Sequence, residues 1–268
     1  VGLIAIAMTF VIAPGGIDFS VGSILGLVAI LTGVFWQNVG LPLPLAAAAA
    51  IAVGTFAGFV NGFIITRFRV PPLIATLATL ALYRGLAEGI SQARSVRGYP
   101  EWFYVLGQGE VLGVPTQLWI LLLAAIVAAI ILAYTRWGRT VYAIGSNEVA
   151  SRFSGLSVEG TKLALYTASG FAASVAAVIF VSRVSTTRSD MGTGIELDAI
   201  TPLGLGGTSI FGGRGTIVGT IIGLCLIQAL KNGLSLAGVK GDGTIMLIGA
   251  VLILAILASN LFERSGTR

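Results

Sequence analysis

Long stretches of this sequence carry no charged side chain. Between residues 1 and 66 the only charged residue is Asp18, and four later stretches contain none. These stretches are residues 111–135, 163–182, 215–230 and 243–262. A hydrocarbon core about 30 Å thick selects helices of about 20 consecutive apolar residues, because a charge buried there is costly. The pattern predicts an all-α polytopic membrane protein and excludes a soluble globular domain.

The amino-acid composition also agrees with a protein that lies mostly within a lipid bilayer. Charged residues make up 10% of the sequence, against about 25% in an average globular protein. The net charge of +5 comes from Lys and Arg in the gaps between apolar runs. They form no basic stripe interleaved with aromatics, so no nucleic-acid partner is expected. The sequence contains no histidine, which removes His metal ligands and His-dependent triads, and we expect no catalytic residue and no metal site.

The apolar runs predict about nine membrane segments in this chain, several of them broken or re-entrant. They fall near residues 1–13, 19–36, 43–66, 71–85, 118–135, 161–182, 195–210, 216–234 and 244–261. Because the chain starts with Val1 inside an apolar run, we expect an N-terminal segment of the full protein to be missing. The stretch between 94 and 116 carries aromatics and turn residues that suit an ordered loop at the membrane interface.

Three glycine-rich breaks interrupt the apolar runs, near residues 13–20, 198–215 and 231–243. Irregular backbone at membrane depth is tolerated only where protein or a wet cavity covers it, since a bare amide in lipid costs several kcal/mol. Broken helices are therefore typical of transport proteins. In the first break we expect Asp18 to cap a helix that starts at Phe19, with a direct role in transport as the alternative.

Uncharged polar residues inside the apolar runs could line a pathway for a hydroxylated solute. Together with Asp18, the candidates for this substrate pathway are Ser20, Ser23, Asn61, Thr76, Thr79, Ser209, Gln228 and Asn232. For each single residue the simpler interpretation is a hydrogen bond that joins neighbouring helices.

One polar segment predicts a short helix outside the membrane, at about residues 147–155. Its candidate residues are Asn147, Glu148, Val149, Arg152, Phe153 and Gly155. The asparagine can cap the helix start and the glycine can end it in the left-handed conformation. Val149 and Phe153 then share one face, beside a charged pair at the same spacing of four residues. Two turns are too few to hold a helix in water, so we expect it to pack against another surface.

Four segments carry a resemblance to a known family. They are GGIDFSVGS from residue 15, NGFIITRFRVPPLIATLATLALYRGLA from residue 61, WGRTVYAIGSNEVASRFSGLSVEGTKLALYTASG from residue 137, and LGGTSIFGGRGTIVGT from residue 205. In this order, and over nearly the whole chain, they resemble the permease subunits of bacterial ABC importers of the ribose, rhamnose and autoinducer-2 type.

The resemblance implies one transmembrane permease domain over residues 1–268, in the bacterial inner membrane, with 147–155 as a cytoplasmic coupling helix. The implied partners are a second permease copy or a paralogue, an ABC ATPase subunit with two nucleotide-binding domains, a periplasmic or lipid-anchored sugar-binding protein, and membrane lipid. The chain itself would hold no cofactor, since ATP and Mg would be bound by the ATPase. In agreement, the sequence has no Gly-Lys dipeptide and therefore no P-loop.

The expected function is the transmembrane subunit of an ATP-driven importer, which moves a monosaccharide or related small hydroxylated solute and is not an enzyme. The alternative is an ion-coupled secondary transporter or a channel for a small polar solute, since broken helices are found there too. A secondary transporter usually needs an ion or proton relay. Asp18 is the only acid in the first 66 residues, so this sequence supplies such a relay poorly.

Overall fold

The computed structural model describes residues 1–92, 94–239, 241, 243, 246–247 and 249–251. The helices in chain order are α1 (Gly2–Ile12), α2 (Val21–Gln37), α3 (Leu43–Arg67), α4 (Pro72–Ser91), α5 (Glu101–Gln108), α6 (Thr116–Tyr134), α7 (Arg136–Ser146), α8 (Glu148–Phe153), α9 (Val158–Val184), α10 (Ile195–Leu205) and α11 (Ile217–Leu236). Four two-residue strands accompany them: β1 (Val96–Arg97), β2 (Glu110–Val111), β3 (Val114–Pro115) and β4 (Thr186–Thr187). The predicted all-α class is confirmed.

Five helices of the described residues are long and apolar enough to cross a membrane, namely α3, α4, α6, α9 and α11. The apolar helices α1 and α2 are shorter, with 11 and 17 residues, and α10 has 11. Eight of the nine predicted segments therefore coincide with a helix. The ninth, 244–261, lies mostly outside the described residues, and the number of segments that cross the membrane stays a prediction.

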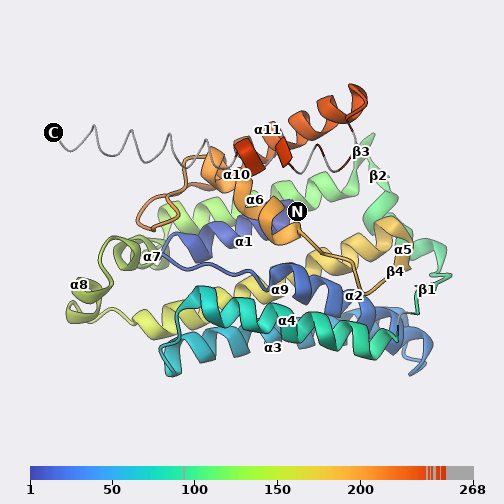
Figure 1. Ribbon diagram of the computed structural model, residues 1–268, viewed down its shortest axis with the longest axis horizontal. Coiled ribbons are helices and arrows are strands. Elements are labelled where there is room, and N and C mark those ends of the chain that lie inside the picture. Colours follow the sequence, from blue (N-terminus) through green and yellow to red (C-terminus); the bar gives the residue numbers. More distant parts are fainter. Residues whose placement is uncertain (93, 240, 242, 244–245, 248, 252–268) are drawn as a thin grey trace.

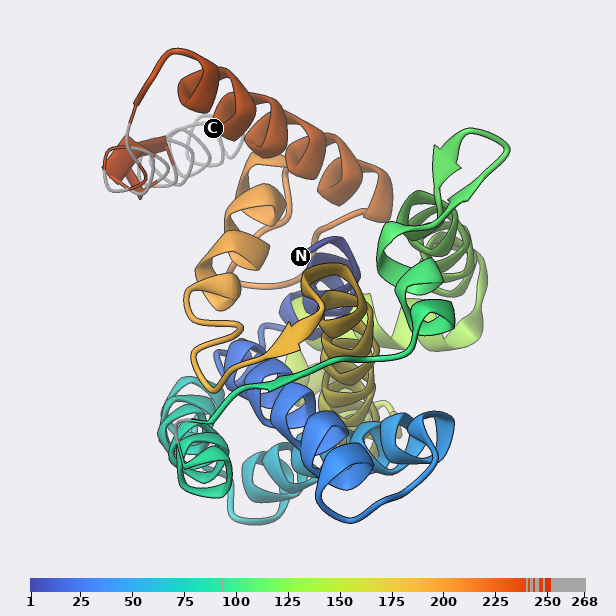
Figure 2. The same ribbon diagram turned by 90° about the vertical axis from the view of Figure 1, so that its right-hand side faces the viewer.

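The long helices lie side by side along the longest axis of the molecule, with α9 among them (Figure 1). Helix α9 packs against α1, α2, α3 and α5. Helices α7 and α8 lie at one end of this bundle, and α5 and the strands lie at the other. Viewed along the bundle, α10 and α11 stand to one side of the group that contains α2, α3, α4 and α9 (Figure 2).

Small residues permit the extensive contact between α3 and α9. A Cβ atom built on Gly58 would lie 2.8 Å from the Cα of Gly170, closer than real Cβ atoms approach. Two glycines at this crossing therefore let the backbones touch, as small residues do between membrane helices. Helix α2 is buried on every side from Val21 to Gly33, which explains why it is apolar all round.

The structure places several boundaries away from their predicted positions. Helix α2 starts at Val21, so the expected start at Phe19 is wrong by two residues. The second break begins only at Gly206, because α10 continues through Pro202, and the third begins after Leu236. Helix α7 and the amphipathic helix α5 were not expected. Both lie outside the long apolar runs, and the helices were predicted from the length of those runs.

Candidate functional site

A short arm connects α6 to α9 at one end of the bundle. Thr135 caps α7, because its side chain accepts a hydrogen bond from the Gly138 amide at 3.1 Å. The extended backbone of Asn147 then separates α7 from α8, and its Oδ1 accepts the Ala150 amide at 2.9 Å. Gly155 takes a φ of +78° just after α8. The predicted short helix is therefore present, with its expected N-cap and its left-handed glycine.

The apolar side chains of α8 point away from the protein. Phe153 is 88% exposed and Val149 is 64% exposed, whereas Ser151 is buried beneath them. An exposed aromatic side chain gains nothing from the fold of this chain. Helix α8 thus presents a small apolar face outside the membrane-spanning helices.

Ion pairs link α8 to the first turn of α9. Arg152 lies 3.5 Å from Glu148 and 2.7 Å from Glu159, and Lys162 lies 2.6 Å from Glu148. The sequence predicted only the pair within α8 and missed the two partners on α9. Exposed ion pairs contribute little to stability individually, but these four alternating charges together hold α8 at one angle to α9.

A pocket lies beside these ion pairs. The turn between α3 and α4 supplies one wall, with Arg69, Pro71 and Pro72, and the other wall comes from Arg152 of α8 and Lys162 of α9. The α3–α4 turn and α8 therefore lie on opposite sides of one pocket. The same end carries Tyr142 of α7, whose hydroxyl donates to the Gly215 carbonyl and whose pKa is raised by burial. The phenol thus stays a donor and ties α7 to the loop before α11.

The buried carboxylate of Asp18 lies between α1 and α2 and is bound by hydroxyl groups. Its Oδ1 accepts the Ser20 amide at 3.0 Å and the Ser20 hydroxyl at 2.6 Å. Its Oδ2 accepts the Ser169 hydroxyl of α9 at 2.8 Å. Asp18 was expected to bind amides inside the first turn of the next helix. It instead binds the amide of the residue that precedes α2, because that helix starts two residues later.

Further hydrogen bonds extend this cluster to α3 and α4. Asn61 donates to the Ser20 hydroxyl at 2.7 Å, and Tyr83 donates to the Ala57 carbonyl at 3.0 Å and reaches Asn61 at 3.4 Å. Tyr166 of α9 donates to the Ile17 carbonyl at 3.3 Å. Sequence reasoning missed Ser169, Tyr83 and Tyr166, since tyrosine and serine in apolar helices carry no local signal of a shared partner.

The remaining candidates for the substrate pathway do not join one site. Ser23, Thr76 and Thr79 are buried and donate to carbonyls of their own chain segment, at 2.8, 2.9 and 3.1 Å. Thr76 also reaches the Ile17 carbonyl beside Asp18, at 3.5 Å. Ser209 is half-buried in the loop before α11, and Gln228 and Asn232 are exposed on α11. Helix α11 contacts α1, α6 and α10, so Gln228 and Asn232 lie apart from the Asp18 cluster. The loop that holds Ser209 instead meets the first break, where the Gly213 amide donates to the Ala13 carbonyl at 2.8 Å. The role of these candidates in a pathway remains a prediction.

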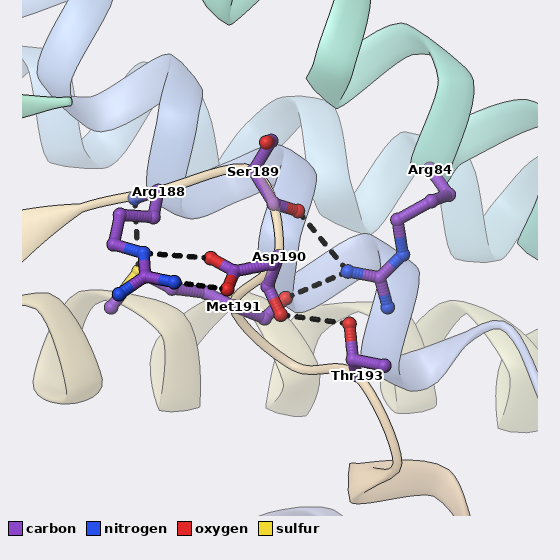
Figure 3. A network of polar contacts seen from close by, with 6 residues as sticks. All are labelled: Arg84, Arg188, Ser189, Asp190, Met191 and Thr193. Atoms are coloured by element: carbon purple, nitrogen blue, oxygen red, sulfur yellow. Dashed lines mark hydrogen bonds and ion pairs between the residues drawn. The ribbon is translucent and has the colours of Figure 1, made fainter. Parts of the chain in front are cut away.

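A loop between β4 and α10 is held by an arginine inside a membrane span (Figure 3). The Nη1 atom of Arg84 on α4 donates to the Ser189 carbonyl at 3.1 Å and to the Met191 carbonyl at 3.0 Å. At the exposed side of the loop, Arg188 pairs with Asp190 through Nε and Oδ1 at 2.9 Å. The positive charge of Arg84 is thus satisfied by backbone dipoles, which lowers the cost of its position in α4.

Charged groups also join the broken helix α10 to α11. Lys231 Nζ lies 2.7 Å from Asp198 Oδ2, and both side chains are partly buried. The described residues contain no group of three or more Asp, Glu, Cys or His side chains placed to hold a metal ion.

Comparison with known proteins identifies the family. The model of the family "branched-chain amino acid transport system / permease component" matches residues 1–256. The chain is 41% identical over 267 residues to the ribose import permease protein RbsC of Escherichia coli K12, covering 96% of this chain and 81% of that protein. It is 38% identical over 263 residues to the autoinducer 2 import system permease protein LsrD of the same strain, with coverage of 96% and 79%. The Shigella flexneri LsrD protein matches equally. No solved structure matches the chain significantly.

The match spans almost the whole chain, and the resemblance to the permease subunits of ABC importers is confirmed. The five long apolar helices agree with this assignment. The chain therefore belongs to the family of permease components, as a transport subunit of an ABC importer rather than an enzyme and as a multi-pass protein of the bacterial inner membrane.

Proposed function

We propose that this permease moves a monosaccharide or a closely related small hydroxylated solute into the bacterial cytoplasm, driven by ATP hydrolysis in a separate ATPase subunit. The substrate class follows from the similarity to import permeases for ribose and autoinducer 2, at 41% and 38% identity. The family description names branched-chain amino acids, but neither of these relatives carries that name.

The observation that carries the coupling part of the proposal is the apolar face of α8. Val149 and Phe153 are exposed outside the spans, on a helix whose start, end and angle are fixed by the Asn147 cap, Gly155 and the ion pairs to α9. An exposed apolar face of this kind can bind in an apolar groove of another protein. We infer that α8 is the cytoplasmic coupling helix and that its groove belongs to an ABC ATPase with two nucleotide-binding domains, which binds ATP and Mg.

The other proposed partners are a second permease copy or paralogue, with a pathway for the solute between the two, and a periplasmic or lipid-anchored sugar-binding protein at the opposite end. The residues proposed to line that pathway are Gln228 and Asn232, which are exposed on α11, and Ser209 in the loop before that helix. A polar side chain exposed on a membrane helix is costly in lipid, so a wet cavity or a partner suits it better. The Asp18 cluster is proposed to brace the break between α1 and α2.

The proposed function is tested by uptake of radiolabelled ribose into proteoliposomes made from the complex that co-purifies with the tagged chain. We expect uptake to require ATP on the membrane face that carries α8, and to persist when proton and sodium gradients are collapsed. Ribose accumulation driven by an ion gradient in the absence of any ATPase would favour the secondary transporter instead. ATP-driven uptake of leucine without uptake of ribose would contradict the substrate class.

A further inference from the structure

A two-stranded hairpin stands out from the end of the bundle opposite α8 (Figure 2). Strands β2 and β3 pair with Val111 opposite Val114, so Leu112 and Gly113 form a two-residue turn. Their φ angles are +57° and +72°. Two consecutive positive φ angles define a type I′ turn, whose first position favours Asn, Asp or Gly.

Leucine at this position is unfavourable in two ways. Its Cβ opposes a positive φ, which costs roughly 1 to 2 kcal/mol for an ordinary side chain. In addition, Leu112 is 89% exposed, so its side chain gains no compensating burial within the described chain. An apolar medium around the tip would remove the cost of the exposed side chain, although the cost of the positive φ would remain.

Apolar side chains near the turn are exposed as well. On α5, Trp102 and Val105 are each 54% exposed, while Phe103 is buried on the opposite face against α9. Val111 of the hairpin is 48% exposed and Trp119 in the first turn of α6 is 41% exposed. The hairpin, the outer face of α5 and the start of α6 thus form a single apolar unit, which we call the hairpin unit.

Hydrogen bonds hold the hairpin unit in its outward position, so that its apolar side chains do not pack onto the bundle. The Trp119 indole N–H donates to the Val111 carbonyl at 3.1 Å. The Thr116 amide donates to the Gly109 carbonyl at 2.9 Å, and the Gln117 side chain donates to the Gly107 carbonyl. The apolar tip is therefore presented outward by a braced scaffold.

We propose that the hairpin unit is a lipid anchor, with Leu112 inserted into the membrane interface at the end of the bundle opposite α8. The occupant is lipid because the unit continues directly into α6, which is the most apolar of the five spans and the least buried within the chain. Tryptophans such as Trp102 and Trp119 favour the interfacial depth, where the ring is in an apolar region and the indole N–H is near polar groups. This proposal does not depend on the solute that the permease carries.

The charges of the hairpin unit define the kind of lipid surface. Residues 101–116 contain two carboxylates, Glu101 and Glu110, and no basic residue. Glu110 lies two residues before the tip, so it limits insertion to the interface. Arg183 of α9 lies beside the unit, since its Nη1 donates to the Gln117 side chain at 3.3 Å, so the charges around the unit are mixed. The anchor therefore binds through its apolar side chains and does not depend on anionic headgroups.

Site-directed spin labelling of the full chain in lipid nanodiscs tests the anchor. Leu112→Cys and Val105→Cys are compared with Ser95→Cys, an exposed polar position at the same end of the bundle, all in a Cys225→Ser background. We expect the ratio of collisions with oxygen to collisions with a water-soluble nickel complex to be several-fold higher at 112 and 105 than at 95. Oxygen partitions into lipid and the nickel complex does not.

Each alternative occupant gives a different result. A nickel accessibility at 112 and 105 equal to that at 95 would place the tip in water and overturn the proposal. A label that neither reagent reaches, or that becomes so when the partner subunits are added, would show a protein contact and overturn it too. The depth should be the same in nanodiscs of phosphatidylcholine alone and in those with added phosphatidylglycerol, and deeper insertion with the anionic lipid would contradict an anchor that does not depend on anionic headgroups.

Discussion

Truncation of Phe153 to alanine is the most direct test of α8 as a coupling helix. Phe153 is 88% exposed and lies outside the long apolar helices. Phe153→Ala should therefore leave the membrane bundle folded and inserted. The Asn147 cap and the ion pairs of Arg152 do not involve the ring, so α8 itself should keep its position.

The expected loss of docking energy follows from the area that the ring can bury. An aromatic side chain buries on the order of 200 Å², and 88% of Phe153 is available for a partner. At about 25 cal/mol per Å², complete burial contributes about 4 kcal/mol. Alanine keeps part of that area, so the change costs about 2 to 3 kcal/mol, or about 30-fold to 150-fold in the dissociation constant.

The assay measures retention of the ATPase during affinity purification through a tag on the permease, together with ATP-driven ribose uptake. Phe171→Ala is the matched control, since Phe171 is 52% exposed and lies at the middle of the long helix α9, far along the helix from the end that contacts α8. We expect Phe153→Ala to lose both the ATPase and uptake, and Phe171→Ala to keep both. Full ATPase retention and full uptake by Phe153→Ala would refute α8 as the docking element.

Three further changes probe the bundle. Gly170→Ala places a Cβ 2.8 Å from the Gly58 Cα and should destabilise the protein by about 1 to 3 kcal/mol, measured as a lower melting temperature. Gly85→Ala should not lower the melting temperature, because the space around Gly85 is open. Asp18→Asn should retain most transport, whereas Asp18→Ala leaves the Ser20 and Ser169 hydroxyls without their acceptor and should lower the free energy of unfolding by about 1 to 3 kcal/mol. Complete loss of transport in a well-assembled Asp18→Asn variant would instead indicate a direct role in transport. Arg84→Met should speed amide hydrogen exchange in residues 189–193. Arg188→Met should not, because Arg188 forms an exposed ion pair with Asp190 that contributes less than about 1 kcal/mol. Equal exchange rates in both variants would contradict a bracing role for Arg84.

The spans and the cap of α8 could be predicted because their signals are local. A charge-free run marks a membrane helix whatever surrounds it, and the eight predicted segments within the described residues each hold a helix. Asn147 and Gly155 act on their own backbone, so their residue types and spacing were sufficient. The hairpin turn was less visible, since Leu112 occupies a position where Asn or Gly would have signalled a type I′ turn.

The partners of buried polar groups could not be predicted, because they come from helices far apart in the chain. Ser169 lies 151 positions from Asp18 and binds its second oxygen, and Arg84 reaches Met191 across 107 positions. Periodicity tells which residue types lie in a span but not which span faces which. The same limit applies to Gln228 and Asn232, whose polarity the sequence shows but whose separation from Asp18 depends on where α11 packs.

The arrangement of these contacts separates the rigid parts of the permease from those able to move. The Asp18 cluster joins the break before α2 to α3, α4 and α9 through bonds among buried groups, and the Gly58 and Gly170 backbones meet within the same group of helices. Helices α10 and α11 stand to one side (Figure 2), joined to each other by the Asp198–Lys231 pair and bounded by the glycine-rich loop at 206–216. Buried polar bonds join α11 and its loop to α1, between Thr9 and Thr220 at 2.7 Å and from the Gly213 amide to the Ala13 carbonyl at 2.8 Å. We therefore expect a change of access that displaces α10 and α11 against the group of α2, α3, α4 and α9 to break these bonds or to carry α1 along. The Tyr142 hydroxyl on α7 donates to the carbonyl of Gly215 in the loop before α11, so a pull on the proposed coupling helix α8 would reach α11 through this bond.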